Sequence, residues 1–232
     1  MKTNLFALLA ALFMLSSCSR SEDDMSEQTN TETPFFNLKV GNEWVYKTYD
    51  REDFTSQLKP NGKVDSLKIV ESVSLNNKTY AKVRHAERNM NYPTVPNDQN
   101  TYYEYWRVNA KGHLVSLNSY YFNQGDTADS REAVKHAGRD YDYSFKDLSF
   151  SEYGITIYKL YPQTNITVDG KSYNVSPYNG QFTPNSGHNY SDLFAKLVEN
   201  NYKEGVGLVK SVCHSVRGTY NFEKHLVSYS LK

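Results

Sequence analysis

The chain has very little cysteine and no excess of charge of either sign. Its 232 residues include two cysteines, Cys18 and Cys213, so a framework of several disulfides is excluded. The 26 basic and 26 acidic residues cancel, and no basic patch stands out that would attract nucleic acid. The composition therefore predicts neither a disulfide-stabilised scaffold nor a nucleic-acid partner.

Long hydrophobic runs are also scarce. An apolar stretch from Leu5 to Leu15 follows Lys2, but it is shorter than the ~20 residues that a helix needs to cross a bilayer. A cationic start, a short apolar run and small residues after it are typical of a secretory signal peptide. A buried N-terminal core helix is the alternative, and the polar, acidic residues after Cys18 argue against it.

The run Leu15-Ser16-Ser17-Cys18 resembles the lipobox of bacterial lipoproteins. The resemblance implies that residues 1–17 are a signal peptide and that Cys18 is the first mature residue, carrying several acyl chains. Each buried methylene contributes ~0.8 kcal/mol, and two or more chains anchor a protein stably. With Cys18 acylated, Cys213 has no cysteine partner, and its apolar neighbours in the sequence predict a buried, inert thiol.

Residues 18–33 have the composition of a disordered acidic tether, because large apolar side chains are almost absent from them. Glu22, Asp23 and Asp24 resemble the export signal of Bacteroidota surface lipoproteins, although serine, arginine and serine stand before the acids here. The resemblance implies a lipid-anchored protein of the outer membrane that is exposed on the cell surface. A plain solvated spacer is the alternative interpretation.

Residues 34–232 are enough for one domain with a sizeable core. The 20 tyrosines and 11 phenylalanines, against four methionines, favour strands over helices. Turn signals at Asn76-Asn77-Lys78, Ala110-Lys111-Gly112 and Asp169-Gly170 separate strand-like runs. Consecutive hairpins predict an all-β fold, an antiparallel meander that forms a strongly curved sheet or partial barrel.

One short helix is predicted at residues 191–200. Leu193, Phe194, Leu197 and Val198 would share one helical face, and Ser191 can cap the first turn.

Two motifs carry a family resemblance. Residues 36–46, FNLKVGNEWVY, look like the opening strand of a group of Bacteroidota lipoproteins that has no assigned activity. Residues 202–210, YKEGVGLVK, are similar to a late motif of the same group, and residues 226–232 resemble its last strand. For the fold, the resemblance implies an antiparallel sheet curled like a half-barrel, as in periplasmic lipoprotein carriers and lipocalin-like proteins.

These motif residues also have a structural interpretation. Trp44 and Tyr46 lie two residues apart and would fill the concave face of the sheet, while Gly205 and Gly207 would allow a bend or bulge.

Catalytic motifs are missing from the sequence. It contains no G-x-S-x-G elbow, no H-E-x-x-H, no glycine-rich phosphate loop and no Cys-x-x-Cys. His214 and His225 lie on neighbouring predicted strands, but no third ligand accompanies them. Any β domain of this size also contains carboxylates that could form an acid–base pair, here Glu71, Glu104, Asp140, Asp142 and Glu152. We therefore predict no enzymatic activity, no metal site and no cofactor.

The best functional lead is a cluster of aromatic residues: Tyr102, Tyr103, Tyr105 and Trp106. Strand alternation would place Tyr103 and Tyr105 on one face and the other two on the opposite face. Exposed rings suit sugars or peptide partners, although tyrosine is also simply a good strand residue. Ser66 and Thr127, each following an aspartate, resemble acceptor sites for O-glycosylation of exported Bacteroidota proteins.

Together these features predict a lipid-anchored cell-envelope protein that is a non-enzymatic binding or structural module. Its partners would be the outer membrane, through the anchor, and a glycan, a peptide or an envelope protein. The alternative is a carrier that holds a hydrophobic ligand or an acyl chain in a half-barrel cavity. A carrier needs a hollow, apolar concave face of several hundred Å3, so the shape of that face decides between the two.

Overall fold

The computed structural model describes residues 34–51, 57–90, 99–148, 151–152, 154–185, 197–214 and 221–232. Residue contacts divide the chain into two units, Met1–Glu32 and Thr33–Lys232. The described residues all belong to the second unit, so the predicted signal peptide and most of the predicted tether lie outside them.

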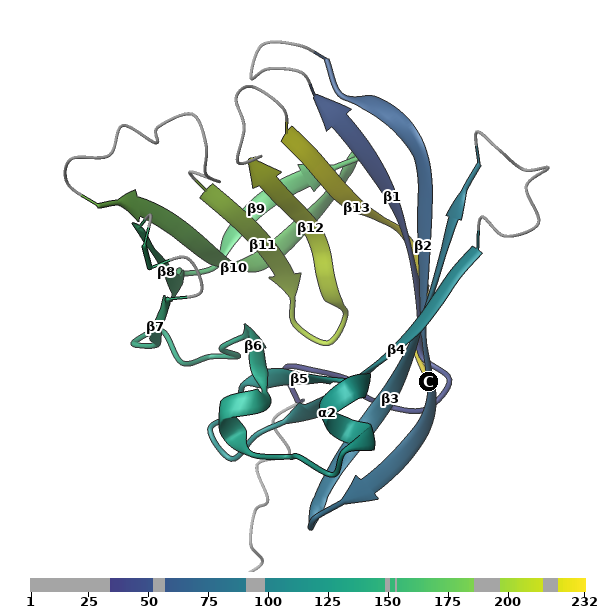
Figure 1. Cartoon of the computed structure of the whole chain (residues 1–232). Helices are drawn as coiled ribbons and strands as arrows, with labels where there is room; N and C mark the ends of the chain where they lie inside the picture. The colour runs from purple at the N-terminus through teal and green to yellow at the C-terminus, as the bar shows by residue number, and fades with distance from the viewer. Residues whose placement is uncertain are drawn as a thin grey trace, which may run out of the picture. The chain divides into compact units, whose positions relative to one another are not determined.

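Thirteen strands of this unit pair antiparallel into a single strongly curved sheet that does not close (Figure 1). Their bounds are β1 Glu43–Arg51, β2 Lys59–Leu75, β3 Lys78–Asn89, β4 Gln99–Val108, β5 Leu114–Asn118, β6 Ala133–His136, β7 Ser144–Asp147, β8 Gly154–Leu160, β9 Thr164–Val168, β10 Lys171–Pro184, β11 Leu197–Lys203, β12 Gly207–His214 and β13 Asn221–Ser230. The order across the sheet is β6-β5-β4-β3-β2-β1-β13-β12-β11-β10-β8-β7, with β9 paired to β10. The predicted all-β, antiparallel, curved sheet is confirmed.

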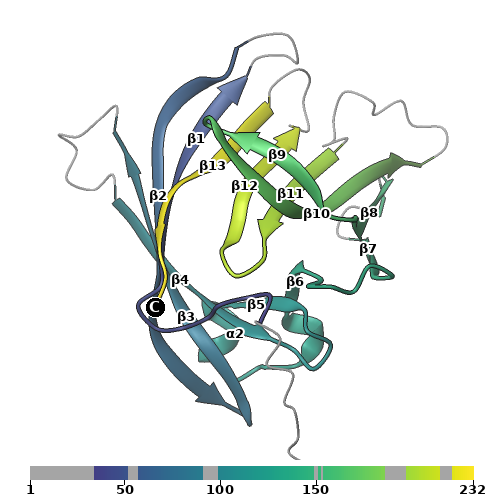
Figure 2. The ribbon, with the colours of Figure 1, turned by 180° about the vertical axis from the view of Figure 1, so that it is seen from behind.

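The hairpins form where the turn residues predict them. Asn76 and Asn77 join β2 to β3 with φ of 50° and 60°, and Asp169 and Gly170 join β9 to β10 with φ of 47° and 78°. Asparagine, aspartate and glycine tolerate this left-handed region, which the tight two-residue turn requires. The β9–β10 hairpin lies across the back of β11–β13 (Figure 2), where Asp169 Oδ1 lies 3.1 Å from His225 Nδ1.

The prediction of a helix at residues 191–200 is wrong for residues 197–200. Residues 197–200 belong to β11, which pairs with β10 on one side and β12 on the other. Two rows of backbone hydrogen bonds outweigh a helical pattern that covers only a few residues. Residues 191–196 lie outside the described ranges. Among the described residues the α-helix is α2 (Ser119–Asn123), which Asn118 caps. A single 3-10 turn, η1, spans Asp129–Arg131. Neither of the two is long and apolar enough to cross a membrane.

Asn42 ties the start of the sheet to its end. Its side chain is fully buried, donates to Asn37 O (2.9 Å) and accepts from the backbone N–H of Lys232 (2.8 Å). The preceding Gly41 has φ of 92° and donates its N–H to Ile69 O. The Gly-Asn part of the opening motif is therefore structural, because it fixes β1, β2 and Lys232 together.

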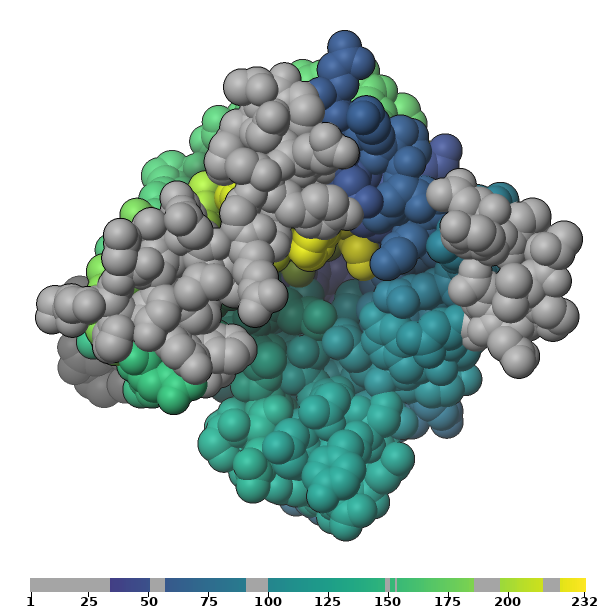
Figure 3. All heavy atoms as spheres, turned by 45° about the horizontal axis from the view of Figure 1, so that its top comes forward, coloured from purple at the N-terminus to yellow at the C-terminus, as the bar shows by residue number. Residues whose placement is uncertain are grey.

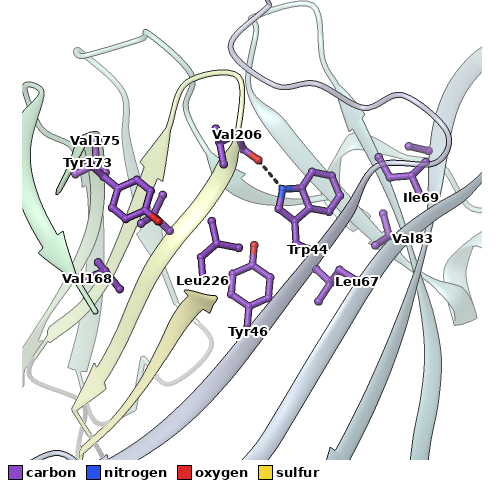
Figure 4. Packing of buried hydrophobic residues seen from close by; sticks show 12 residues of the cluster. Trp44, Tyr46, Leu67, Ile69, Val83, Val168, Tyr173, Val175, Val206 and Leu226 are labelled. Atoms are coloured by element: carbon purple, nitrogen blue, oxygen red, sulfur yellow. Dashed lines mark hydrogen bonds between the residues drawn. The ribbon is translucent and has the colours of Figure 1, made fainter. Parts of the chain in front are cut away.

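Trp44 and Tyr46 satisfy backbone groups that the sheet leaves open. β12 pairs with β13 only from Lys210 onward, so the beginning of β12 bends away from β13. Trp44 Nε1 donates to Val206 O (2.6 Å) and Tyr46 OH donates to Leu208 O (3.0 Å), as Figure 4 shows for the tryptophan. Buried carbonyls need partners, and here two aromatic side chains provide them.

His136 bridges the edge strand β6 to β10. Its ring is buried, stacks on Phe35 with centroids 5.0 Å apart, accepts from Gly138 N–H at Nδ1 (3.0 Å), and donates from Nε2 to Ser176 O (3.0 Å). These two bonds require a neutral imidazole with its proton on Nε2. Burial lowers the pKa of His136 from 6.5 to about 4. A side chain thus joins parts of the sheet that backbone pairing does not connect.

We predict that Trp44→Ala strongly destabilises the domain. Trp44 is 5% exposed, and truncating a buried tryptophan costs ~3–5 kcal/mol of a net stability of ~5–15 kcal/mol. Urea unfolding followed by circular dichroism measures the loss. Val108→Ala is the control, since Val108 is 42% exposed and its change should stay within about 0.5 kcal/mol. Equal stability of the two variants would contradict the structural role of Trp44.

We also predict that His136 makes the domain less stable in mild acid. In the unfolded chain His136 binds a proton below about pH 6.5, whereas in the folded state its pKa is about 4. The free energy of unfolding therefore decreases as the pH falls between these two values. Between pH 7.5 and pH 5 the loss is ~2 kcal/mol. The same urea experiment with His136→Gln, which keeps a donor for Ser176 O, should show a correspondingly smaller pH dependence. A slope unchanged by the substitution would mean that other groups carry the acid sensitivity.

Candidate functional site

The concave face of the sheet is hollowed in two adjoining places, the inner pocket and the outer chamber. The inner pocket is a cavity of about 110 Å3 and the outer chamber measures about 460 Å3. Asp65 and Lys224 line both. Figure 3 looks into this side of the domain, where the surface is recessed between β13 (yellow) and the teal part of the chain. Of these two, the outer chamber falls within the ~300–1,000 Å3 of ordinary small-molecule sites.

The inner pocket is apolar and aromatic over most of its wall. The two tryptophans of the chain, Trp44 and Trp106, both line it. The other apolar residues in its wall are Phe36, Leu38, Tyr46, Leu67, Leu114, Tyr202, Val206 and Leu208. They come from the segment before β1, from β1, β2, β4, β5, β11 and β12, and from the turn between β11 and β12, so both resemblance motifs contribute.

A row of alternating charges borders the inner pocket, with one residue from each of five strands. Lys224 Nζ lies 2.8 Å from Asp65 Oδ2, which lies 3.7 Å from His85 Nδ1. On the other side, His85 Nε2 lies 3.5 Å from Glu104 Oε2, which is 3.0 Å from Lys135 Nζ. Opposite charges thus alternate across β13, β2, β3, β4 and β6, and we call these five residues the charge row.

Mutual attraction favours the ionised forms of Asp65, His85 and Glu104 although these side chains are largely buried. Burial opposes the charged forms, but His85 and Lys224 hold the pKa of Asp65 below its ordinary value. His85 and Lys135 likewise lower the pKa of Glu104 well below its usual range, and the two carboxylates raise the pKa of His85. Buried charges persist when they are paired in this way. Asp65 Oδ1 is buried and has no hydrogen-bond partner among the described residues.

Most of the residues that line the outer chamber are polar, although apolar atoms make up the larger share of its exposed surface. The polar residues in its wall are Thr48, Asp50, Asn61, Lys63, Asp65, Glu87 and Lys224, and they come from β1, β2, β3 and β13. Asn61 Nδ2 donates to Asp50 Oδ1 (3.0 Å). Phe222 also lines the chamber and is 38% exposed. The chamber therefore offers hydrogen-bond donors, acceptors and one aromatic ring that water can reach.

The structure separates the four predicted aromatic residues. Tyr105 is 6% exposed and stacks on Phe122 of α2, with centroids 3.6 Å apart, while Tyr103 is 37% exposed. On the other face, Tyr102 is also 37% exposed and stacks on His85 (4.4 Å), and Trp106 lines the inner pocket. Each face therefore has one packed and one accessible ring, and no pair of rings faces solvent together. Of the four aromatic residues, Trp106 is the one whose side chain lines the inner pocket.

The two residues predicted as O-glycosylation sites, Thr127 and Ser66, are poorly accessible. Thr127 is 7% exposed and its hydroxyl lies 3.3 Å from Asn76 Nδ2, and Ser66 lies mid-strand between β1 and β3. A glycan on Thr127 would require that loop to open. Cys18, Glu22, Asp23 and Asp24 lie outside the described residues.

Three of the five candidate acid–base carboxylates form ion pairs with basic side chains. Glu71 pairs with Lys82 and Asp140 with His113, while Glu104 belongs to the charge row. Asp142 and Glu152 are exposed.

The candidate metal and thiol residues are also accounted for. His214 and His225 are not opposite each other, since His225 pairs with Lys210. Within the described ranges, no three His, Cys, Asp or Glu side chains are arranged to hold a metal ion. Cys213 is partly buried, and burial raises the pKa of its thiol, which lowers its reactivity.

No protein-family model and no curated protein sequence matches this chain. A candidate lipoprotein structure from Parabacteroides distasonis is 14% identical, with a TM-score of 0.42, and the match covers 84% of this chain and 98% of that one. A candidate exported protein with a YmcC-like fold from Bacteroides fragilis is 8% identical, with a TM-score of 0.46 and the same two coverages, 84% and 98%. A β-barrel-like domain of unknown function from Brucella abortus is 9% identical, with a TM-score of 0.33, over 85% and 100%. Likeness at this level carries no conclusion about function.

Proposed function

We propose that the protein is a lipid-anchored module of the cell envelope that binds a ligand on the concave face of its sheet and catalyses no reaction. Acylation of Cys18 would attach it to the outer membrane, and Glu22, Asp23 and Asp24 would direct it to the cell surface. The lipobox resemblance supports the anchor, and the concave face supports the binding role.

One observation carries the binding role. The outer chamber, at about 460 Å3, has the size of a ligand site, and its wall combines polar side chains with the accessible ring of Phe222. An accessible ring beside hydrogen-bonding groups is a combination that small-ligand sites use for contact and orientation. We therefore assign the ligand site to the outer chamber and the adjoining inner pocket, with Trp106 as the contribution from the aromatic strand.

The carrier alternative draws its support from the apolar inner pocket. At about 110 Å3, that pocket is far below the several hundred Å3 that an acyl chain needs. The neighbouring outer chamber is large enough, but most of the residues in its wall are polar or charged, and the Lys224–Asp65 ion pair (2.8 Å) lies between the two cavities. Burying an acyl chain there would leave charged groups without water. The geometry thus favours a polar ligand over a lipid.

We predict that Cys18→Ser releases the protein from membranes. Serine has no thiol to carry an acyl chain, and stable anchoring requires two or more acyl chains. Membrane fractionation after labelling with a clickable palmitate analogue measures both attachment and acylation. Cys213→Ser is the matched control and should stay labelled and membrane-bound. Label retained in Cys18→Ser would refute the anchor.

We predict that Thr48→Tyr abolishes ligand binding without unfolding the domain. Thr48 lines the outer chamber from β1, and tyrosine is a good strand residue that would fill the space. The control is Thr79→Tyr on the exposed end of β3. Neutral oligosaccharides, tripeptides and decanoate are titrated against each variant, with melting temperature and tryptophan emission as readouts, since both tryptophans line the inner pocket. Binding by no class of compound, or equal binding by Thr48→Tyr, would refute the proposed site.

A further inference from the structure

We infer that the ligand of the outer chamber is a neutral glycan, one sugar ring of which stacks on Phe222. The inference rests on the proposed binding function and names its ligand class. It is supported by the balance of charge in the chamber, by the exposed ring, and by the positions of the surrounding strands within the sheet.

The charges of the chamber suit a neutral, hydroxylated ligand. Lys63 and Lys224 stand beside Asp50, Asp65 and Glu87 in its wall, so an anion or a cation would meet repulsion as well as attraction. Two carboxylates already have partners, Asp50 in Asn61 and Asp65 in Lys224. Sugar hydroxyls both donate and accept, so they can bond to carboxylates and ammonium groups alike without disturbing these pairs.

The aromatic ring supplies the second half of sugar recognition. Phe222 is 38% exposed, and it and Val64 are the apolar residues among the described residues of the wall. A pyranose ring has an apolar face of C–H groups and an equatorial belt of hydroxyls. Stacking that face on Phe222 would cover the ring, while the belt meets the polar side chains around it. The chamber, at about 460 Å3, has the volume of an ordinary small-ligand site, which suits a short glycan.

The sheet order argues against an extended peptide. Peptides commonly bind by adding a strand to a free sheet edge. The strands that line the chamber, β1, β2, β3 and β13, are each paired on both sides, and the edge strands among the described residues are β6, β7 and β9. Recognition in the chamber therefore depends on side chains alone, as glycan recognition does.

The test is an array of neutral oligosaccharides, acidic oligosaccharides and tripeptides, followed by calorimetry with the strongest neutral hit. Phe222→Ala should weaken that binding roughly three- to tenfold, and Phe222→Tyr should restore it. Phe145→Ala is the matched control, because Phe145 is 46% exposed on β7 and does not line the chamber. The affinity for a neutral glycan should also stay constant from about 50 to 500 mM salt, since screening acts on charged ligands.

The outcomes separate this inference from the proposed function. Tripeptides or acidic compounds that bind, and are blocked by Thr48→Tyr, would overturn the neutral glycan and leave the binding site standing. A neutral glycan whose affinity is the same for wild type and Phe222→Ala would overturn the stacking. No binding by any class would overturn both the inference and the proposed function.

Discussion

The structure depends on two hydrogen bonds that run from aromatic side chains of β1 to the beginning of β12. β12 and β13 part before Lys210, and Trp44 and Tyr46 donate to the carbonyl oxygens of Val206 and Leu208 in the space that opens. Without these donors the separation would leave buried carbonyls unpaired, at a cost of ~1–3 kcal/mol each. The two motifs that resemble one lipoprotein group, 160 residues apart in the chain, are therefore halves of one contact. All four residues of this contact line the inner pocket, so the contact is also part of the pocket's wall.

The polar side of the concave face follows from the same curvature. A flat sheet would expose Asp65 and His85 to water, whereas here both are nearly inaccessible, at 4% and 6%. Their burial is tolerable because every member of the charge row has a neighbour of opposite charge, and removing one partner from such a row leaves an uncompensated charge. The row also divides the concave face by chemistry. On one side lies a small apolar pocket bounded by tryptophans, and on the other a larger chamber lined mostly by polar residues. A ligand that entered from the chamber, as we propose, would meet hydrogen-bonding side chains first.

Local sequence was enough to predict the hairpins, but it could not predict how the strands meet. Asn76-Asn77 and Asp169-Gly170 determine their turns through their own tolerance of positive φ, so the strand boundaries beside them followed directly. The predicted helix failed because Leu197 and Val198 fit a helical face and a paired strand equally well, and the pairing with β10 and β12 decided between them. A signal for the site was present and was missed: Asp65 is in phase with Leu67 and Ile69, as His85 is with Ala81 and Val83. A charge on the apolar face of a strand indicates a partner across the sheet. The identity of that partner depends on the register of five strands, which no local pattern contains.

The location of the site also follows from how the sheet ends. An open sheet has two free edges, and edges invite pairing with other chains. Here β6 is short, at four residues, and His136 at its end is bonded to Ser176 of β10 and packed between Phe35 and Tyr202. A neutral, buried histidine is a costly group to place in a core, and its position is explained if it replaces the missing backbone ladder between β6 and β10. With this edge occupied by side chains and the central strands fully paired, backbone groups contribute little to recognition at the concave face. If the concave face binds a ligand as we propose, specificity would come from side chains, and the described side chains of the outer chamber are hydrogen-bonding groups around the ring of Phe222.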